Sequence, residues 1–359
     1  MRAKAGQIVM RNAALAVSRC ALLLGAVLTA MPMPSANTQA VTAGLKNGAV
    51  FTEYSALSTT PELVRRLLSP LSGLRVKQEA ANTGKTLRGQ PIDLASERFS
   101  IYVPVHPHPP PHSYSLLVFV PPWSSAQVPS QWIPALDRHS VILVTPANSG
   151  NDVSAVDRRE PLAVLAAQNV MAQYSVDPQQ VYIGGFSGGS RVALRLALGY
   201  PDVFHGALLN AGSDPIGNAD VPLPPAELFR RFQDSMRLVY VTGERDDAHL
   251  VDDMHSRQSL EKWCVFDLVT QTEPRKGHEP ADASAFSRSL DALLKPVETR
   301  PNRLADCRAR IDEELTTQLK QVADAFERGD PSTARRLLGR IDAHYGGLAA
   351  PRSVELAAQ

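Results

Sequence analysis

The sequence predicts an α/β fold in which a mostly parallel central sheet is flanked by helices. Short apolar runs rich in β-branched residues recur at 114–120, 140–145 and 237–243, with helix-like stretches between them. The first run is nearly continuous, which is typical of a strand buried on both faces. A further run leads into Gly185-Phe-Ser-Gly-Gly189 and then directly into a helix-like segment, 191–199. Strands that alternate with helices in this way favour a parallel sheet.

Residues 1–40 have the features of a signal peptide. Basic residues precede an apolar segment at 21–30, and Thr38-Gln39-Ala40 forms a small-x-small cleavage pattern. The apolar segment is too short to span a membrane comfortably. We therefore expect export to the periplasm or the medium, with no stable membrane span after cleavage. Removing the four basic residues of this segment leaves 33 basic and 36 acidic residues. This balance, without a basic stripe, argues against a nucleic-acid partner.

Three further regions are expected after the signal. Residues 41–92 form an N-terminal extension that contains a short helix, residues 93–300 form the α/β domain, and residues 301–359 form a helical hairpin. Alternating residues at 98–104 predict an early antiparallel strand in the second region.

A proline-rich loop carries His106, His108 and His112. Proline stiffens this loop, and no carboxylate stands near it in the sequence. We interpret it as a solvated hairpin loop, with a metal site as the less favoured alternative. No metal site is predicted elsewhere.

The segment Gly185-Phe-Ser-Gly-Gly189 matches the G-x-S-x-G motif. It lies between a predicted strand and a predicted helix, as the nucleophilic serine of this motif does. A serine on so tight a turn has a strained backbone, and a β-carbon on a flanking glycine would collide with the crossing strand or helix. The amide of Gly188 would lie at a helix N-terminus, where an oxyanion is stabilised. The alternative is a glycine-rich turn in which Ser187 only caps the helix, because the motif alone is weak.

Candidate partners for Ser187 follow two later strands. The strand at 237–243 leads into two aspartates, and an apolar run at 264–269 leads to Gly277-His278. The carboxyl ends of parallel strands meet at one edge of a sheet. Ser187, an aspartate and His278 therefore predict a Ser-His-Asp triad in the chain order of a serine hydrolase.

The acid of this triad is Asp246 or Asp247. The spacing from Gly243 favours Asp246, and Asp247 remains the alternative. His249 and His255 lie in or near the next helix, and we interpret both as surface or capping residues.

The loop after the strand at 114–120 is the expected source of the second oxyanion donor. Pro121 and Pro122 have no N–H, so the donor should be the amide of Trp123 or, less favoured, that of Ser124. Trp123 is also a candidate wall of the acyl pocket, with a tryptophan packed in the core as the alternative. The other substrate-binding candidates are Phe186, beside the serine, and Asn148, in a loop at the same edge.

Two cysteines remain after signal removal, since Cys20 lies in the signal segment. Cys264 and Cys307 form an even pair, which in an exported protein suggests one disulfide. Two buried thiols are the alternative.

The C-terminal region has helical periodicity. Apolar residues fall on one helical face, Gly329 ends that helix, and Asp330-Pro331 begins the next as cap and first-turn proline. Packing of this hairpin against the α/β domain is the favoured interpretation, and a groove for another protein is the alternative. The residues of the first face are Ile311, Leu315, Leu319, Val322 and Phe326.

Roughly residues 95–296 resemble the polyhydroxybutyrate depolymerase and feruloyl esterase branch of the α/β-hydrolases. The resemblance is carried by the serine turn, Tyr200-Pro-Asp-Val-Phe204, the acid position Gly243-x-x-Asp246 and Gly277-His278. Where many members carry His-Gly, this chain has Pro121-Pro122. The resemblance implies the α/β-hydrolase fold and a serine esterase.

The expected function is that of an exported serine hydrolase that cleaves carboxylic esters through an acyl-enzyme. Its substrate would be a small or oligomeric ester, and no cofactor is expected. Two alternatives remain open: a peptidase or acyltransferase that uses the same triad, and a non-catalytic binding protein on a hydrolase scaffold.

Overall fold

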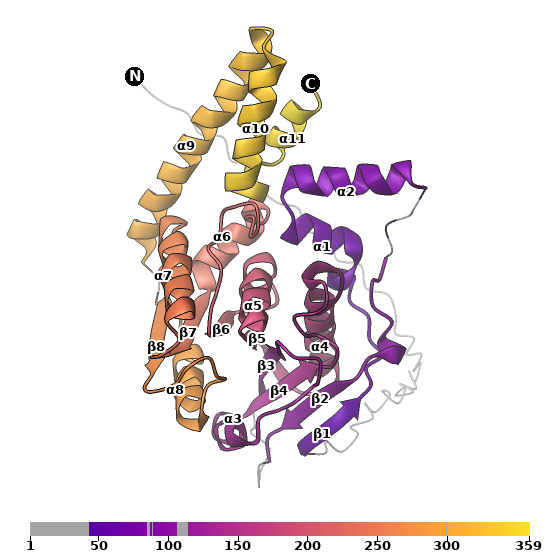
Figure 1. Ribbon diagram of the computed structural model, residues 1–359, viewed down its shortest axis with the longest axis vertical. Helices are drawn as coiled ribbons and strands as arrows, with labels where there is room; N and C mark the ends of the chain where they lie inside the picture. Colours follow the sequence, from indigo (N-terminus) through magenta and orange to yellow (C-terminus); the bar gives the residue numbers. More distant parts are fainter. Residues whose placement is uncertain (1–42, 85–86, 88, 106–113, 299) are drawn as a thin grey trace, which may run out of the picture. The chain divides into compact units, whose positions relative to one another are not determined.

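A computed structural model describes residues 43–84, 87, 89–105, 114–298 and 300–359 (Figure 1). The predicted signal peptide and the loop with His106, His108 and His112 lie outside the described residues. Within the described part of the chain, no helix has the length and apolar character needed to cross a membrane.

Eight strands form one sheet in the order β1-β2-β4-β3-β5-β6-β7-β8. All neighbouring pairs from β4 to β8 are parallel, and β2 is antiparallel to both β1 and β4. This mostly parallel sheet, with a serine turn after β5, is the α/β-hydrolase fold that the sequence predicted. The strands are β1 Gly44–Ala49, β2 Phe99–Val103, β3 Tyr114–Val120, β4 Val141–Pro146, β5 Val176–Phe186, β6 Gly206–Asn210, β7 Arg237–Gly243 and β8 Leu268–Glu273.

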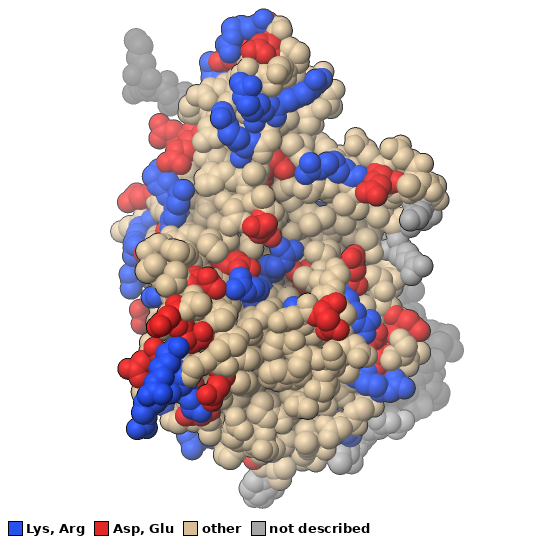
Figure 2. Space-filling model, viewed as in Figure 1, with Lys and Arg blue, Asp and Glu red and all other residues tan. Residues whose placement is uncertain are grey.

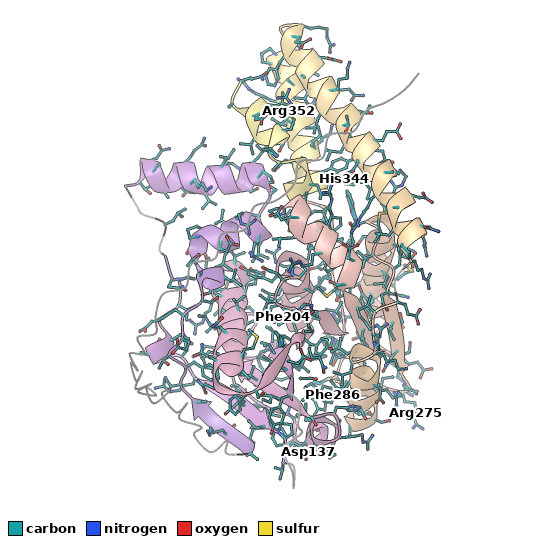
Figure 3. All side chains as sticks on the ribbon, turned by 180° about the vertical axis from the view of Figure 1, so that it is seen from behind. Asp137, Phe204, Arg275, Phe286, His344 and Arg352 are labelled. Carbon is teal, nitrogen blue, oxygen red and sulfur yellow. A yellow bond between two sulfur atoms is a disulfide. The ribbon has the colours of Figure 1, made fainter. Side chains whose placement is uncertain are left out.

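Helices cover both faces of the sheet (Figure 1). On one face, α3 (Ile133–His139) and α8 (Ala283–Leu293) enclose a core that contains Phe286 (Figure 3). The ring of Trp132 stacks on that of Phe286, with centroids 4.1 Å apart. A larger core lies on the other face, because the nearly all-apolar strands need cover on both sides. Its helices are α1 Thr60–Leu67, α4 Glu160–Gln173, α5 Gly188–Gly199, α6 Ala226–Ser235 and α7 Asp247–Lys262.

The segment expected as an N-terminal extension is part of this architecture. β1 pairs with β2 at the edge of the sheet, so the sheet begins before residue 93. Asn169 of α4 accepts hydrogen bonds from the amides of Thr52 and Glu53 and donates one to the Glu53 carbonyl, which fixes the connection after β1. The segment continues as η1 Ala56–Ser58, α1 and α2 Pro70–Asn82, and η2 Leu94–Ser96 follows it before β2.

The last strand begins later than the sequence suggested. The apolar run at 264–269 predicted a strand over its whole length, but β8 starts at Leu268. Cys264 has a φ of 66°, and both Cys264 and Val265 are buried in the core. These residues therefore form a buried turn between α7 and β8. Two short helical turns complete the sheet domain: η3 Ser130–Trp132 and the π-helix η4 Ala155–Arg159.

The C-terminal region is a hairpin of α9 (Pro301–Glu327) and α10 (Pro331–Tyr345), followed by η5 Gly346–Ala349 and α11 Arg352–Ala357. The turn has the predicted chemistry: Gly329 has a φ of 75°, and Asp330 caps α10 by accepting a hydrogen bond from the Thr333 amide. The sequence did not predict α11. Lys and Arg side chains gather on the outer surface of these helices (Figure 2).

The foot of the hairpin packs on the sheet domain. The Gly347 amide donates to the Leu223 carbonyl at 2.7 Å, and the ring of Tyr345 meets that of Trp263 edge to face. His344 lies beside the same tryptophan (Figure 3). Cys264 and Cys307 form the predicted disulfide, with Cα atoms 5.8 Å apart. The hairpin is thus joined to the domain by backbone, aromatic and covalent contacts.

Candidate active site

The site lies where the parallel strands end. The turn after β5 places Ser187 at φ 54° and ψ −124°, a conformation that costs free energy for any residue other than glycine. The flanking glycines are needed for the reason that the sequence indicated. A β-carbon on Gly185 would lie 2.2 Å from the backbone of Gly189, and one on Gly189 would lie 2.0 Å from the Val120 carbonyl oxygen. The turn therefore brings Ser187 to the edge of the sheet and packs α5 tightly against β3.

The structure brings the three predicted triad residues together. Ser187 Oγ lies 2.9 Å from His278 Nε2, and His278 Nδ1 lies 2.8 Å from Asp246 Oδ2. Asp246 is buried, with 7% of its side chain exposed, whereas 39% of the His278 side chain is exposed. Asp247 begins α7 with its side chain exposed and makes no hydrogen bond to His278. The geometry therefore places Asp246, and not Asp247, behind the imidazole.

The protonation state of Asp246 suits this position. Burial alone would raise the pKa of its carboxyl group, but hydrogen bonds from His249 and His278 outweigh burial and lower the pKa below its ordinary value. The carboxylate therefore stays charged at neutral pH, as the acid of a triad must.

His249 is a site residue that the sequence interpretation missed. It was interpreted as a surface or capping residue, but its Nδ1 lies 2.7 Å from Asp246 Oδ1. Its ring also stacks on that of His278, with centroids 4.1 Å apart and planes inclined by 15°. The sequence feature that could have indicated this contact is the spacing of Asp246 and His249. They are three residues apart at the start of a helix, so their side chains lie on the same face.

The candidate oxyanion donors come from two segments, the start of α5 and the loop after β3. The amide of Gly188 is the first of α5, where helix geometry leaves an N–H without an intrahelical acceptor. The loop that carries Trp123 is held by the loop after β4: the Asn151 amide donates to the Pro122 carbonyl at 3.0 Å, and the Asn148 amide donates to the Ser124 carbonyl at 2.6 Å. The position of the Trp123 amide is therefore fixed by backbone hydrogen bonds from a neighbouring loop.

A buried arginine reinforces the same pair of loops. Arg159, at the end of η4, donates to the Ser149 carbonyl at 2.9 Å and to the Pro121 carbonyl at 3.0 Å. Its burial lowers the pKa of the guanidinium group. Arg159 thus connects the loop after β3 to the loop after β4. Its described hydrogen bonds go to these loops and not to Ser187.

The substrate-binding candidates differ in their surroundings: Phe186 and Trp123 contact other aromatic rings, whereas Asn148 is exposed. The ring of Phe186 is 4.8 Å from that of His278 and 6.1 Å from that of Trp123, so Phe186 lies next to the imidazole that faces Ser187. The indole N–H of Trp123 is buried and has no partner among the described residues. Asn148 has a φ of 50° and an exposed side chain. A second residue of its loop, Asn151, lies against the serine turn, because a β-carbon on Gly188 would come within 2.1 Å of its Oδ1.

Three groups of the site have the spacing of a possible metal site. One ligand atom each from Asp246, His249 and His278 lie within 4.8 Å of one another. Both carboxylate oxygens and both Nδ1 atoms are already paired in hydrogen bonds, and His278 Nε2 faces Ser187. This pattern of donors and acceptors fits proton transfer between the side chains.

No protein-family model matches the chain, and no curated protein matches it either. Among solved structures, the S-formylglutathione hydrolase of Staphylococcus aureus is 12% identical with a TM-score of 0.44, over 55% of this chain and 93% of that one. A ferulic acid esterase is 16% identical with a TM-score of 0.40, over 55% and 90% of the two chains. A putative dipeptidyl aminopeptidase IV from Bacteroides ovatus is 15% identical with a TM-score of 0.42, over 55% of this chain but only 34% of that one. These similarities are distant, and we therefore assign the fold from the strand order and the serine turn.

Proposed function

We propose that this protein is an exported serine hydrolase that cleaves carboxylic esters. The observation that carries the proposal is the continuous hydrogen-bonded chain from Ser187 Oγ through His278 to Asp246, with distances of 2.9 and 2.8 Å. A serine becomes nucleophilic when an adjacent imidazole can accept its proton and a carboxylate orients that imidazole. A binding protein on the same scaffold would need none of these contacts.

The reaction would proceed through an acyl-enzyme. His278 Nε2 takes the proton from Ser187 Oγ as that oxygen attacks the ester carbonyl, and the amides of Gly188 and Trp123 hold the resulting oxyanion. His278 then gives the proton to the departing alcohol, which leaves the acyl group on Ser187. His278 then takes a proton from water as the water oxygen attacks the acyl carbon, and it returns that proton to Ser187 Oγ as the bond between Oγ and the acyl carbon breaks and the acid leaves. Asp246 keeps the proton of the neutral imidazole on Nδ1 and stabilises the charged form.

Three features support the exported location and the breadth of the site. The disulfide between Cys264 and Cys307 fits an oxidising compartment, as does the signal-like segment at residues 1–40. The exposed imidazole of His278 leaves room for an acyl or alcohol group that extends into solvent, so oligomeric as well as small esters are candidate substrates.

The test measures both chemistry and substrate class. The purified protein is incubated with p-nitrophenyl acetate and butyrate, with dipeptidyl p-nitroanilides and with a fluorophosphonate probe. We expect turnover of the esters and stoichiometric labelling of Ser187. Ser187→Ala should abolish labelling and lower ester turnover by about 10⁵-fold or more. The exposed Ser284 of α8 offers a matched control, Ser284→Ala, which should leave both unchanged.

Other outcomes would redirect the proposal. Turnover of the anilides without that of the esters would make the protein a peptidase. Transfer of the acyl group to an added alcohol in preference to water would make it an acyltransferase. A folded protein that neither labels nor hydrolyses any of these substrates would contradict the proposal as a whole.

A further inference from the structure

The carboxylate of Asp246 accepts hydrogen bonds from two imidazoles that come from different parts of the chain. His278 lies in the loop after β8 and donates to Oδ2, whereas His249 lies in the first turn of α7 and contacts Oδ1. Each oxygen of the carboxylate is therefore held by one ring nitrogen. A triad of three residues accounts for only the first of these contacts.

The position of Asp246 in its helix makes the second contact informative. Asp246 is the N-cap residue of α7, and an aspartate at this position ordinarily accepts hydrogen bonds from the first free amides of the helix. Here its side chain makes no such capping bond. Both oxygens point instead toward the imidazoles of His249 and His278. The backbone amides at the start of α7, which could also bind this carboxylate, are not its partners.

His249 is itself held in place. Its ring stacks on that of His278 with centroids 4.1 Å apart. On another side lies Gly212, whose φ is 99° and where a β-carbon would come within 2.3 Å of His249 Cδ2. A side chain at position 212 would displace the ring, which means that the loop after β6 is shaped to accommodate it.

We propose that His249 is a positioning residue for the triad, and this inference rests on the function proposed above. By donating its Nδ1–H to Oδ1, His249 holds the Asp246 carboxylate in the rotamer that faces His278 and away from the amides at the start of α7. A carboxylate held through both oxygens keeps the His278 imidazole in the tautomer and orientation that Ser187 needs. His249 has no described contact with Ser187; it contacts Asp246 through a hydrogen bond and His278 through the stacked rings.

The experiment compares three variants of the purified protein. His249→Phe keeps an aromatic ring for the stack but removes the N–H, whereas His249→Asn keeps an N–H donor on a shorter side chain. His255→Phe is the matched control, because His255 lies exposed on the same helix. The measured quantities are the rate of Ser187 labelling by a fluorophosphonate, kcat and KM for p-nitrophenyl butyrate, and the thermal midpoint.

The expected pattern separates positioning from a purely structural role. Loss of one hydrogen bond to a charged group should slow labelling and lower kcat by about 10- to 100-fold in His249→Phe, with KM changed by less than about threefold. His249→Asn should recover most of that loss, and His255→Phe should match the unmodified protein. Should His249→Phe fail to fold, His249→Ala removes the same N–H and takes its place in the comparison.

Two results would overturn the inference. Labelling of His249→Phe at the unmodified rate would show that the second imidazole does not position the triad. Equal losses in His249→Phe and His249→Asn would show that the N–H is not what matters. A protein that is labelled rapidly but hydrolyses no ester would contradict the proposed function, and the relative labelling rates would still decide whether His249 positions the triad.

Discussion

The active-site edge of the sheet and the C-terminal hairpin differ in how their backbones are built. Four non-glycine residues with positive φ lie just after the carboxyl ends of strands: Asn148, Ser187, Ala211 and Arg275. In the described part of the hairpin, from Pro301 onward, only glycines have positive φ. Such conformations cost about 1–3 kcal/mol each in non-glycine residues. Most of the strained non-glycine residues in the described part of the chain thus lie at the edge that carries Ser187, and the other two, Ser140 and Cys264, precede β4 and β8.

The two regions also differ in what stabilises them. At the active-site edge, loops are held by polar contacts between distant segments, such as those of Arg159 with the carbonyls of Pro121 and Ser149. The hairpin is held by an apolar seam, by helix caps and by the Cys264–Cys307 disulfide. The helices and the turn of the hairpin therefore depend on residues close together in the sequence, whereas the site depends on contacts between distant segments.

The largest effect should come from the acid of the triad. Asp246→Asn should lower kcat by about 10³- to 10⁴-fold, because an amide cannot stabilise the charged imidazole and favours the wrong tautomer of His278. Asp247→Asn should change kcat by less than about threefold, since the exposed Asp247 side chain has no contact with His278. The two variants are compared by ester kinetics, with thermal unfolding as the control for folding. Comparable losses from both aspartates would contradict the assignment of Asp246.

A smaller effect, on stability alone, is expected from the disulfide of the hairpin. The bond joins residues 43 positions apart, and closing a loop of this size stabilises the folded state by about 3–4 kcal/mol through the unfolded ensemble. Cys264→Ser with Cys307→Ser should lower the free energy of unfolding by about that amount and leave kcat unchanged at low temperature. Urea unfolding and ester kinetics of the same sample provide the measurement. A loss of activity in the folded double variant would show that the two regions are coupled.

The smallest effect should come from a buried carboxyl group near the site. Burial raises the pKa of Asp253 to about 6, although Thr242 donates a hydrogen bond to this carboxyl group and Arg257 and His249 lie nearby. Because the folded state binds this proton more tightly than the unfolded state, stability is lost as pH rises from about 4 to about 6. Asp253→Asn stays neutral, so between pH 4 and pH 7 its free energy of unfolding should gain about 3 kcal/mol relative to the unmodified protein. Urea unfolding at the two pH values tests this, and parallel pH profiles would contradict it.

Much of the site could be predicted because its requirements are local. The glycines around Ser187 are imposed by close backbone contacts within a few residues of the turn, so the motif is visible in the sequence. The disulfide could be predicted because only two cysteines follow residues 1–40, the segment predicted to be a signal peptide. The sequence did not predict β1 or the turn at Cys264, because neither has a distinctive side-chain pattern. β1 pairs through backbone hydrogen bonds that leave little side-chain pattern, and the buried turn at Cys264 has the same apolar composition as a strand.

By itself, the sequence determined the α/β fold class, the serine turn and the chain order of the candidate site, because each depends on residue type and short spacing. Only the tertiary structure shows Asp246 hydrogen-bonded to His278, with His249 at the other oxygen of the same carboxylate. Adjacent side chains point in different directions, and which one faces His278 depends on how α7 leaves β7 and on where the loop after β8 folds back. Spacing from Gly243 could only favour Asp246, because that direction is set by packing between segments that are 32 residues apart in the chain.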